Sequence, residues 1–87
     1  MKIKKGFILR SVAGSNIVIA VGSESRSFNK LIKLNGTAAF LFRQLAEDRT
    51  EEQLAAALTA QYEVSAEQAK ADVSDFLKTI GEAGLLV

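Results

Sequence analysis

The 87 residues include no histidine and no cysteine, so the side chains that could do chemistry in this chain are carboxylates, lysines, serines and the single tyrosine, Tyr62. That composition removes the commonest base near neutral pH, the thiolate nucleophile and the usual ligands of transition metals. The carboxylates gather at predicted helix starts and on polar faces, where capping and solubility explain them, and the six glycines form no phosphate-binding pattern. We therefore predict no catalytic residue, no metal site and no cofactor, and expect that the protein is not an enzyme.

The chemistry that remains is binding, and the strongest candidate is an apolar, β-prone segment that carries lysines. Lys30 and Lys33 flank Leu31 and Ile32 just before Asn35, where the hydrophobic period changes from two to about 3.6. If this segment is the last strand of a small sheet, its edge exposes backbone N–H and C=O groups to which an extended peptide could add. The lysines could then meet acidic peptide residues, or they could equally protect the edge against pairing. The sequence leaves both alternatives open.

Two strands are predicted to precede this segment, which is itself the third strand. Residues 7–12 and 16–21 are rich in large apolar residues, and the short loop between them contains Gly14, which is typical of a β-hairpin. The third strand is expected within residues 28–34. Strands joined by such short connections pair antiparallel, because parallel pairing needs a long crossover. The sequence thus predicts an antiparallel meander.

The second predicted strand also indicates which side of the sheet is buried. Ile17, Ile19 and Val21 alternate with other residues and so share one face of this strand. We expect that this face lies in the core.

Three helices are predicted after the strands. Asn35, Thr50 and Ser65 each stand where a side chain accepts a hydrogen bond from the first helical turn, and Thr50 and Ser65 also begin capping-box patterns. The third helix should stop near Gly84, a typical C-terminal cap. The predicted fold class is α+β: a winged helix-turn-helix-like unit in which a three-stranded antiparallel sheet is followed by three helices (βββααα). We expect residues 1–87 to form a single domain.

Charge divides the chain into two halves and bears on the class of partner. Residues 1–43 carry eight Lys or Arg against one acid, a net +7, whereas residues 44–87 carry three against nine, a net −6. Winged-helix proteins often read DNA with their third helix, but the predicted third helix has a net charge of −2 and would repel phosphates. Nucleic-acid binding through the basic sheet is kept as the alternative function.

The order of several short motifs resembles a known family along essentially the whole chain. Residues 33–45 read KLNGTAAFLFRQL, which is similar to the strand-to-helix segment of the pyrroloquinoline quinone (PQQ) biosynthesis protein D (PqqD) family. Residues 50–54 (TEEQL), 72–77 (DVSDFL) and 84–86 (GLL) follow that family's later motifs in the same order. Phe42 departs from the pattern, since the family often has Trp there, so the resemblance leaves open whether the pathway product is PQQ or another modified peptide.

The resemblance implies a RiPP recognition element, a non-catalytic chaperone for a ribosomally synthesised precursor peptide. In this family the leader adds to the third strand, lies against the third helix and is presented to a modifying enzyme, often of the radical S-adenosylmethionine (SAM) type. Residues such as Val73, Phe76 and Leu77 on a helix of this kind are more often core residues than binding residues. The predicted peptide-binding residues, on the strand and then on the helix, are Asn29, Lys30, Leu31, Ile32, Lys33, Leu34, Lys70, Val73, Phe76 and Leu77.

The two ends of the sequence suggest where the protein resides and how it assembles. No apolar run long enough for a signal peptide or a membrane span follows the basic residues 1–5, so we expect a cytoplasmic protein with no membrane contact. The apolar tail, residues 85–87, and the uncovered strand edge could both support a homodimer.

Overall fold

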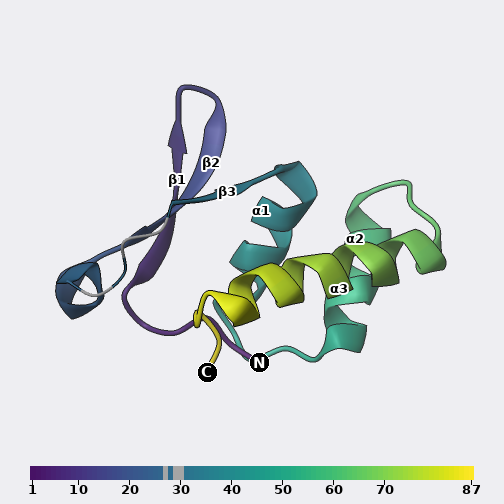
Figure 1. The fold of residues 1–87 in the computed structure, drawn as a ribbon. Coiled ribbons are helices and arrows are strands. Elements are labelled where there is room, and N and C mark those ends of the chain that lie inside the picture. The colour runs from purple at the N-terminus through teal and green to yellow at the C-terminus, as the bar shows by residue number, and fades with distance from the viewer. Residues whose placement is uncertain (27, 29–30) are drawn as a thin grey trace.

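A computed structural model describes residues 1–26, 28 and 31–87 of the chain. Two of the predicted binding residues, Asn29 and Lys30, lie outside the described residues. Figure 1 shows a small sheet with the three α-helices gathered on one side of it, and the predicted α+β class and βββααα order are confirmed. The elements are β1 (Phe7–Val12), β2 (Ser15–Ala20), the 3-10 helix η1 (Gly22–Arg26), β3 (Ile32–Leu34), α1 (Gly36–Gln44), α2 (Glu51–Gln61) and α3 (Ala66–Glu82).

The sheet is an antiparallel meander in the order β1-β2-β3, as predicted. β1 and β2 are joined by Ala13 and Gly14, whose φ angles of 51° and 80° are both positive. A two-residue loop with this geometry matches the right-handed twist of the strands it connects. The order leaves β1 and β3 as the two edge strands, and β3 runs into α1 with Asn35 between them.

The face of β2 that enters the core is the opposite of the one expected from the sequence. Val18 has no exposed surface, whereas Ile17 and Ile19 are half-buried and Val21 is exposed. In the antiparallel register Val18 lies opposite Ile32 of β3, a buried residue. The prediction was wrong because both faces of β2 are apolar, and the choice between them depends on the pairing register rather than on alternation within the strand.

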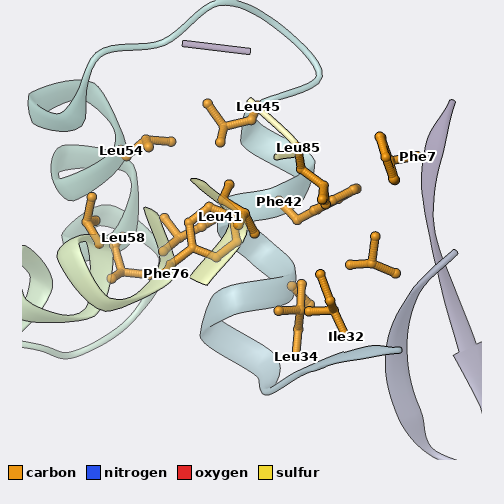
Figure 2. Close-up of a cluster of buried hydrophobic side chains, with 14 of the residues drawn as sticks. Phe7, Ile32, Leu34, Leu41, Phe42, Leu45, Leu54, Leu58, Phe76 and Leu85 are labelled. Carbon is orange, nitrogen blue, oxygen red and sulfur yellow. The ribbon is translucent and has the colours of Figure 1, made fainter. Parts of the chain in front are cut away.

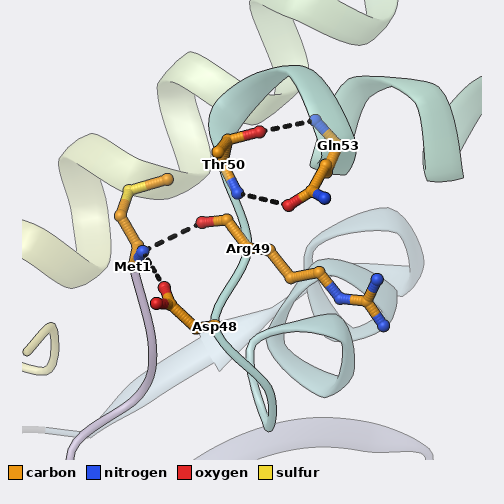
Figure 3. Close-up of polar contacts among 5 residues, drawn as sticks. All are labelled: Met1, Asp48, Arg49, Thr50 and Gln53. Atoms are coloured by element: carbon orange, nitrogen blue, oxygen red, sulfur yellow. Dashed lines mark hydrogen bonds and ion pairs between the residues drawn. The ribbon is translucent and has the colours of Figure 1, made fainter.

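Side-chain caps begin the helices at the predicted residues. The Asn35 Oδ1 atom accepts from a backbone N–H of the first turn of α1 at 2.8 Å. At α2, Thr50 Oγ1 accepts from the Gln53 N–H and Gln53 Oε1 accepts from the Thr50 N–H, at 3.1 and 2.9 Å (Figure 3). This is the complete capping box predicted for α2. At α3 the Ser65 hydroxyl oxygen accepts from the Gln68 N–H at 3.0 Å, but among the described contacts the Gln68 side chain bonds Asp72 and not Ser65, so only half of the predicted capping box forms.

The core lies between the sheet and the three helices (Figure 2). Sheet residues such as Phe7 and Leu34 meet side chains from all three helices and Leu85 from the C-terminal segment. Phe28 packs edge-to-face on Phe7, with ring centroids 5.0 Å apart. The largest fully buried side chains are Leu41, Leu45, Leu54, Leu58, Ile80, Leu85, Val18 and Val73.

The two ends of the chain lie beside each other (Figure 1) and hold the connection between α1 and α2. Ile3 and Leu86 form an antiparallel bridge. The Met1 ammonium donates to the Asp48 carboxylate and to the Arg49 carbonyl (Figure 3), and this hydrogen bond with its charge lowers the pKa of Asp48. Of the helices in the described residues, none is both long and apolar enough to cross a membrane.

Candidate functional site

The free edge of β3 is the part of the sheet that the sequence singled out for binding. Ile32 and Leu34 point into the core and are buried, whereas Leu31, just before the strand, is 77% exposed and Lys33 is exposed. Strand alternation explains this division. In the described part of the chain, β3 pairs with β2 alone, so its other edge offers backbone donors and acceptors to a further strand.

A cavity of about 210 Å³ lies beside this edge, between the end of β3 and α3. Leu34 and Phe76 are almost fully buried and form its apolar floor. Polar side chains from three elements surround that floor. The cavity is lined by Lys33, Leu34, Asn35, Thr37, Ala38, Asp72, Asp75, Phe76 and Thr79.

Helical spacing explains why α3 supplies one wall. Asp72, Phe76 and Thr79 are separated by four and three residues, so they follow one face of the helix. Thr79 is turned back onto its own helix, with Oγ1 donating to the Asp75 carbonyl at 3.0 Å. Asp72 accepts from the Gln68 amide at 2.8 Å. The i, i+4, i+7 spacing was available in the sequence, and residues 72–77 were noted there as a family motif, but Asp72 and Asp75 were not among the predicted binding residues.

The other predicted residues of α3 lie elsewhere. Lys70 and Val73 line a separate hollow of about 430 Å³, together with Glu51 and Glu52 at the start of α2. Leu77 is half-buried and packs against the core. Of the predicted residues that the structure describes, the cavity therefore brings together three, Lys33, Leu34 and Phe76.

The two walls of the cavity carry opposite charge. Lys33 supplies a cation on the strand side, while Asp72 and Asp75 supply carboxylates on the helix side. Among the described residues, no cluster of three or more acidic side chains is arranged to hold a metal ion. An open strand edge, an apolar floor and charged walls are the features of a groove that takes an extended chain.

The fold and the groove define an α+β, winged-helix-like unit with one open strand edge facing a helix. The sequence model of the family described as "Coenzyme PQQ synthesis protein D (PqqD)" matches residues 9–86, and the chain belongs to this family.

Two solved structures share the fold over nearly the whole chain. One is described as "TbiB1 in Complex with the TbiA(beta) Leader Peptide", with a TM-score of 0.76, 20% identity, and coverage of 99% of this chain and 94% of that one. The other is "Lasso peptide synthetase B1 complexed with the leader peptide", with a TM-score of 0.74, 21% identity, and coverage of 99% and 95%. None of the curated proteins matches the sequence.

Proposed function

We propose that this chain is a non-catalytic recognition element that captures the leader of a ribosomally made precursor peptide by strand addition to β3. The observation that carries the proposal is the free edge of β3 beside the cavity against α3. Membership of the PqqD family supports it, and so does the likeness of the fold to two proteins solved with leader peptides. Residues 1–87 are proposed to form one recognition domain.

The leader is expected to extend the sheet as a fourth, antiparallel strand. Its backbone would pair with β3, and its side chains would point alternately to the two faces of the sheet. Those pointing inward would meet Leu34 and Phe76, with Asp72 and Asp75 within reach of a basic leader residue. Those pointing outward would pass Lys33, where an acidic leader residue fits.

The predicted contacts fall into three groups under this proposal. Leu31 and Ile32 stand with Lys33 and Leu34 on the strand side, and Phe76 stands on the helix side. Asn29 and Lys30 are proposed to extend the strand contact, although they lie outside the described residues. Lys70, Val73 and Leu77 lie outside the cavity, so their contact with the leader stays a prediction that this groove does not support.

The partner after the leader is proposed to be a peptide-modifying enzyme of the radical SAM type, acting in the cytoplasm. The product is proposed to be either PQQ or another modified peptide, because family membership by itself does not distinguish them. A homodimer that used the β3 edge would compete with the leader, so leader binding is assigned to the monomer. The alternative, a nucleic-acid-binding protein, is disfavoured by Asp72 and Asp75 on the groove wall, which would repel phosphates.

The first test is an amide-shift titration of the labelled protein with the leader peptide encoded beside it, and separately with duplex DNA. Leader binding should shift residues 31–34 and the α3 residues that line the cavity. Shifts caused only by DNA, centred on the basic sheet and reduced by salt, would reject the proposal in favour of nucleic-acid binding. If neither ligand shifts any amide signal, no support remains for a binding role of this groove.

A double variant tests the strand side of the groove directly. Leu31→Asp with Lys33→Glu should abolish leader binding while circular dichroism stays unchanged, because both side chains are exposed. The matched control is Val87→Asp with Lys78→Glu, which makes the same substitution types at exposed positions away from the cavity. The control should bind the leader like the wild type. Wild-type affinity of the Leu31→Asp, Lys33→Glu variant would show that the leader does not bind in this groove.

Proline substitutions in the leader test the ladder itself. Proline removes a backbone N–H, so it should weaken binding at alternate leader positions, where that group pairs with β3. Equal tolerance at every position would indicate recognition by side chains without strand addition.

A further inference from the structure

The side of the sheet away from the helices carries a patterned apolar surface. Cross-strand pairs place Ile8 beside Ile19, and place Ile17 between Arg10 and Lys33. We call these five residues the outer face. Because strand side chains alternate, they point away from the core that holds Val18.

The outer face consists of two neighbouring rows with different chemistry. One row, Arg10–Ile17–Lys33, sets a cation at each end of an apolar centre. The other begins with Ile8 and Ile19, and continuing the register by one residue places the 77% exposed Leu31 next to Ile19. The rows are about 7 Å apart, two residues along a strand, so one apolar side chain of a partner can touch both.

The apolar surface continues past the β1 edge into a hollow of about 410 Å³. Ile8 belongs to both, and the buried rings of Phe7 and Phe42 line the hollow. Lys4 and Arg43, both exposed, also line it. The charged side chains along the whole surface, from the hollow to the far end of the outer face, are therefore cations.

We propose that the outer face and this hollow dock the peptide-modifying enzyme, through an apolar patch on the enzyme that is flanked by carboxylates. Arg10 and Lys33 lie on the two edge strands, two strand spacings or about 10 Å apart, which sets the separation of the carboxylates they would meet. Complementary charge of this kind steers encounter and fixes orientation. The inference rests on the proposed function, since it assigns the second partner of the same recognition element.

Two other occupants fit the surface less well. A second copy stacked face to face would bring Arg10 and Lys33 of each copy against the same cations of the other, and like charges in an interface cost affinity. Nucleic acid would satisfy the cations but would set phosphates over the isoleucine rows, which gain nothing from that contact. An acidic, partly apolar protein surface satisfies both rows.

The position of this surface suits an enzyme that must act on a bound leader. The outer face is turned away from the helices, whereas the cavity that holds the leader lies between β3 and α3. The enzyme can therefore dock without displacing the peptide. Lys33 contributes to both surfaces, so the docked enzyme would lie directly beside the leader.

The test uses the full chain with the leader and the modifying enzyme encoded beside it. Arg10→Glu with Ile19→Thr changes the outer face and leaves the cavity residues untouched. The matched control, Lys78→Glu with Val87→Thr, makes the same change of charge at exposed sites outside both surfaces. The outer-face variant should bind the enzyme at least about tenfold more weakly and keep leader affinity within about twofold, and raising salt should weaken the wild-type and control complexes more than that of the variant.

Several results would overturn the inference. The inference is wrong if the outer-face variant binds the enzyme with wild-type affinity. It is also wrong if the control variant loses as much affinity for the enzyme as the outer-face variant does. If the double variant fails to fold, Arg10→Glu alone and the amide footprint of the enzyme on the wild type replace it; a footprint on α2 or α3 and not on residues 8–10 and 17–19 rejects the site. Self-association that Arg10→Glu changes, or a DNA footprint on these strands stronger than the enzyme's, also rejects it.

Failure of the proposed function gives a different pattern. In that case the leader leaves no footprint on β3 and α3, whatever the enzyme does. An enzyme footprint on the outer face in the absence of leader binding would support the docking surface and reject the leader-recognition role. A leader footprint without any enzyme contact on the outer face would support leader recognition and reject the docking surface.

Discussion

The sheet and the helices of this chain are specified in different ways. Each helix begins with a side chain that hydrogen-bonds its own first turn, at Asn35, Thr50 and Ser65. The hairpin loop joins β1 and β2 locally, but no local feature fixes which face of the sheet is buried. β2 is apolar on both faces, with Val18 buried on one and Ile17 half-buried on the other. The helices are thus determined by neighbours in sequence, whereas the orientation of the sheet depends on contacts between distant residues.

The largest expected effect tests the two faces of the sheet with one substitution. Val18→Thr places a hydroxyl where no surface is exposed, and we expect it to lower the free energy of unfolding by about 1–3 kcal/mol. Val12→Thr makes the same change on the outward side of β1, where the side chain is 49% exposed, and should change it by no more than about 0.5 kcal/mol.

Urea denaturation of the two variants measures this difference. Equal losses would mean that the sheet is not oriented with Val18 inward. A larger loss at Val12 would reverse the faces and restore the orientation expected from the sequence.

This asymmetry also explains how much of the structure could be predicted. The strand order, the helices and their caps follow from local patterns, because turn loops and capping residues act within a few positions. The buried side of β2 could not be predicted, because Ile17 and Ile19 satisfy the alternation as well as Val18 does within the strand alone. Only the pairing with Ile32 and the packing of the helices decide it.

The candidate site divides in the same way. Lys33, Leu34 and Phe76 were predicted and lie together at the cavity. Asp72 and Asp75 were visible as charges, but their place on the wall depends on how α3 is rotated against β3. That rotation comes from the burial of Ala69, Val73, Phe76 and Ile80 in the core.

A smaller effect is expected at the junction between the two regions. Asn35→Ala removes the oxygen that caps α1, and we expect a loss of about 1 kcal/mol in the free energy of unfolding. Asn35→Asp keeps an acceptor and should be close to the wild type. Ser65→Ala, at the cap of α3, should cost about the same as Asn35→Ala, and urea denaturation of all three compares them. A much larger loss at Asn35 would show that this cap also holds β3, which would weaken the contrast between local helices and a non-local sheet.

A charge exchange tests whether Lys33, at the edge of the sheet, pairs with an acidic leader residue. Lys33→Glu alone should weaken leader binding by about two- to fivefold, which is the range of an exposed ion pair. Replacing the leader's facing acidic residue by lysine should restore the affinity of this variant, and should weaken binding to the wild type. Calorimetric titration of the wild type and of Lys33→Glu, each with the original and the altered leader, gives the coupling free energy between the two side chains. Strictly additive losses would show that Lys33 does not face an acidic leader residue, and that it protects the edge instead.

The smallest effect concerns the contact that ties the chain ends to the helices. The hydrogen bond and charge of the Met1 ammonium hold the pKa of Asp48 below its usual value, with a minor contribution from Lys2. A carboxyl group with a lowered folded pKa stabilises the protein above its unfolded pKa of about 3.9 and loses that contribution as the pH falls through the folded value. Asp48→Asn should therefore be slightly less stable than the wild type near pH 7, and the two melting temperatures should converge as the pH falls below about 4. A difference that stays constant with pH would mean that Asp48 contributes only as a neutral hydrogen-bond acceptor. The electrostatic part of the contact between the chain ends and the helices would then be absent.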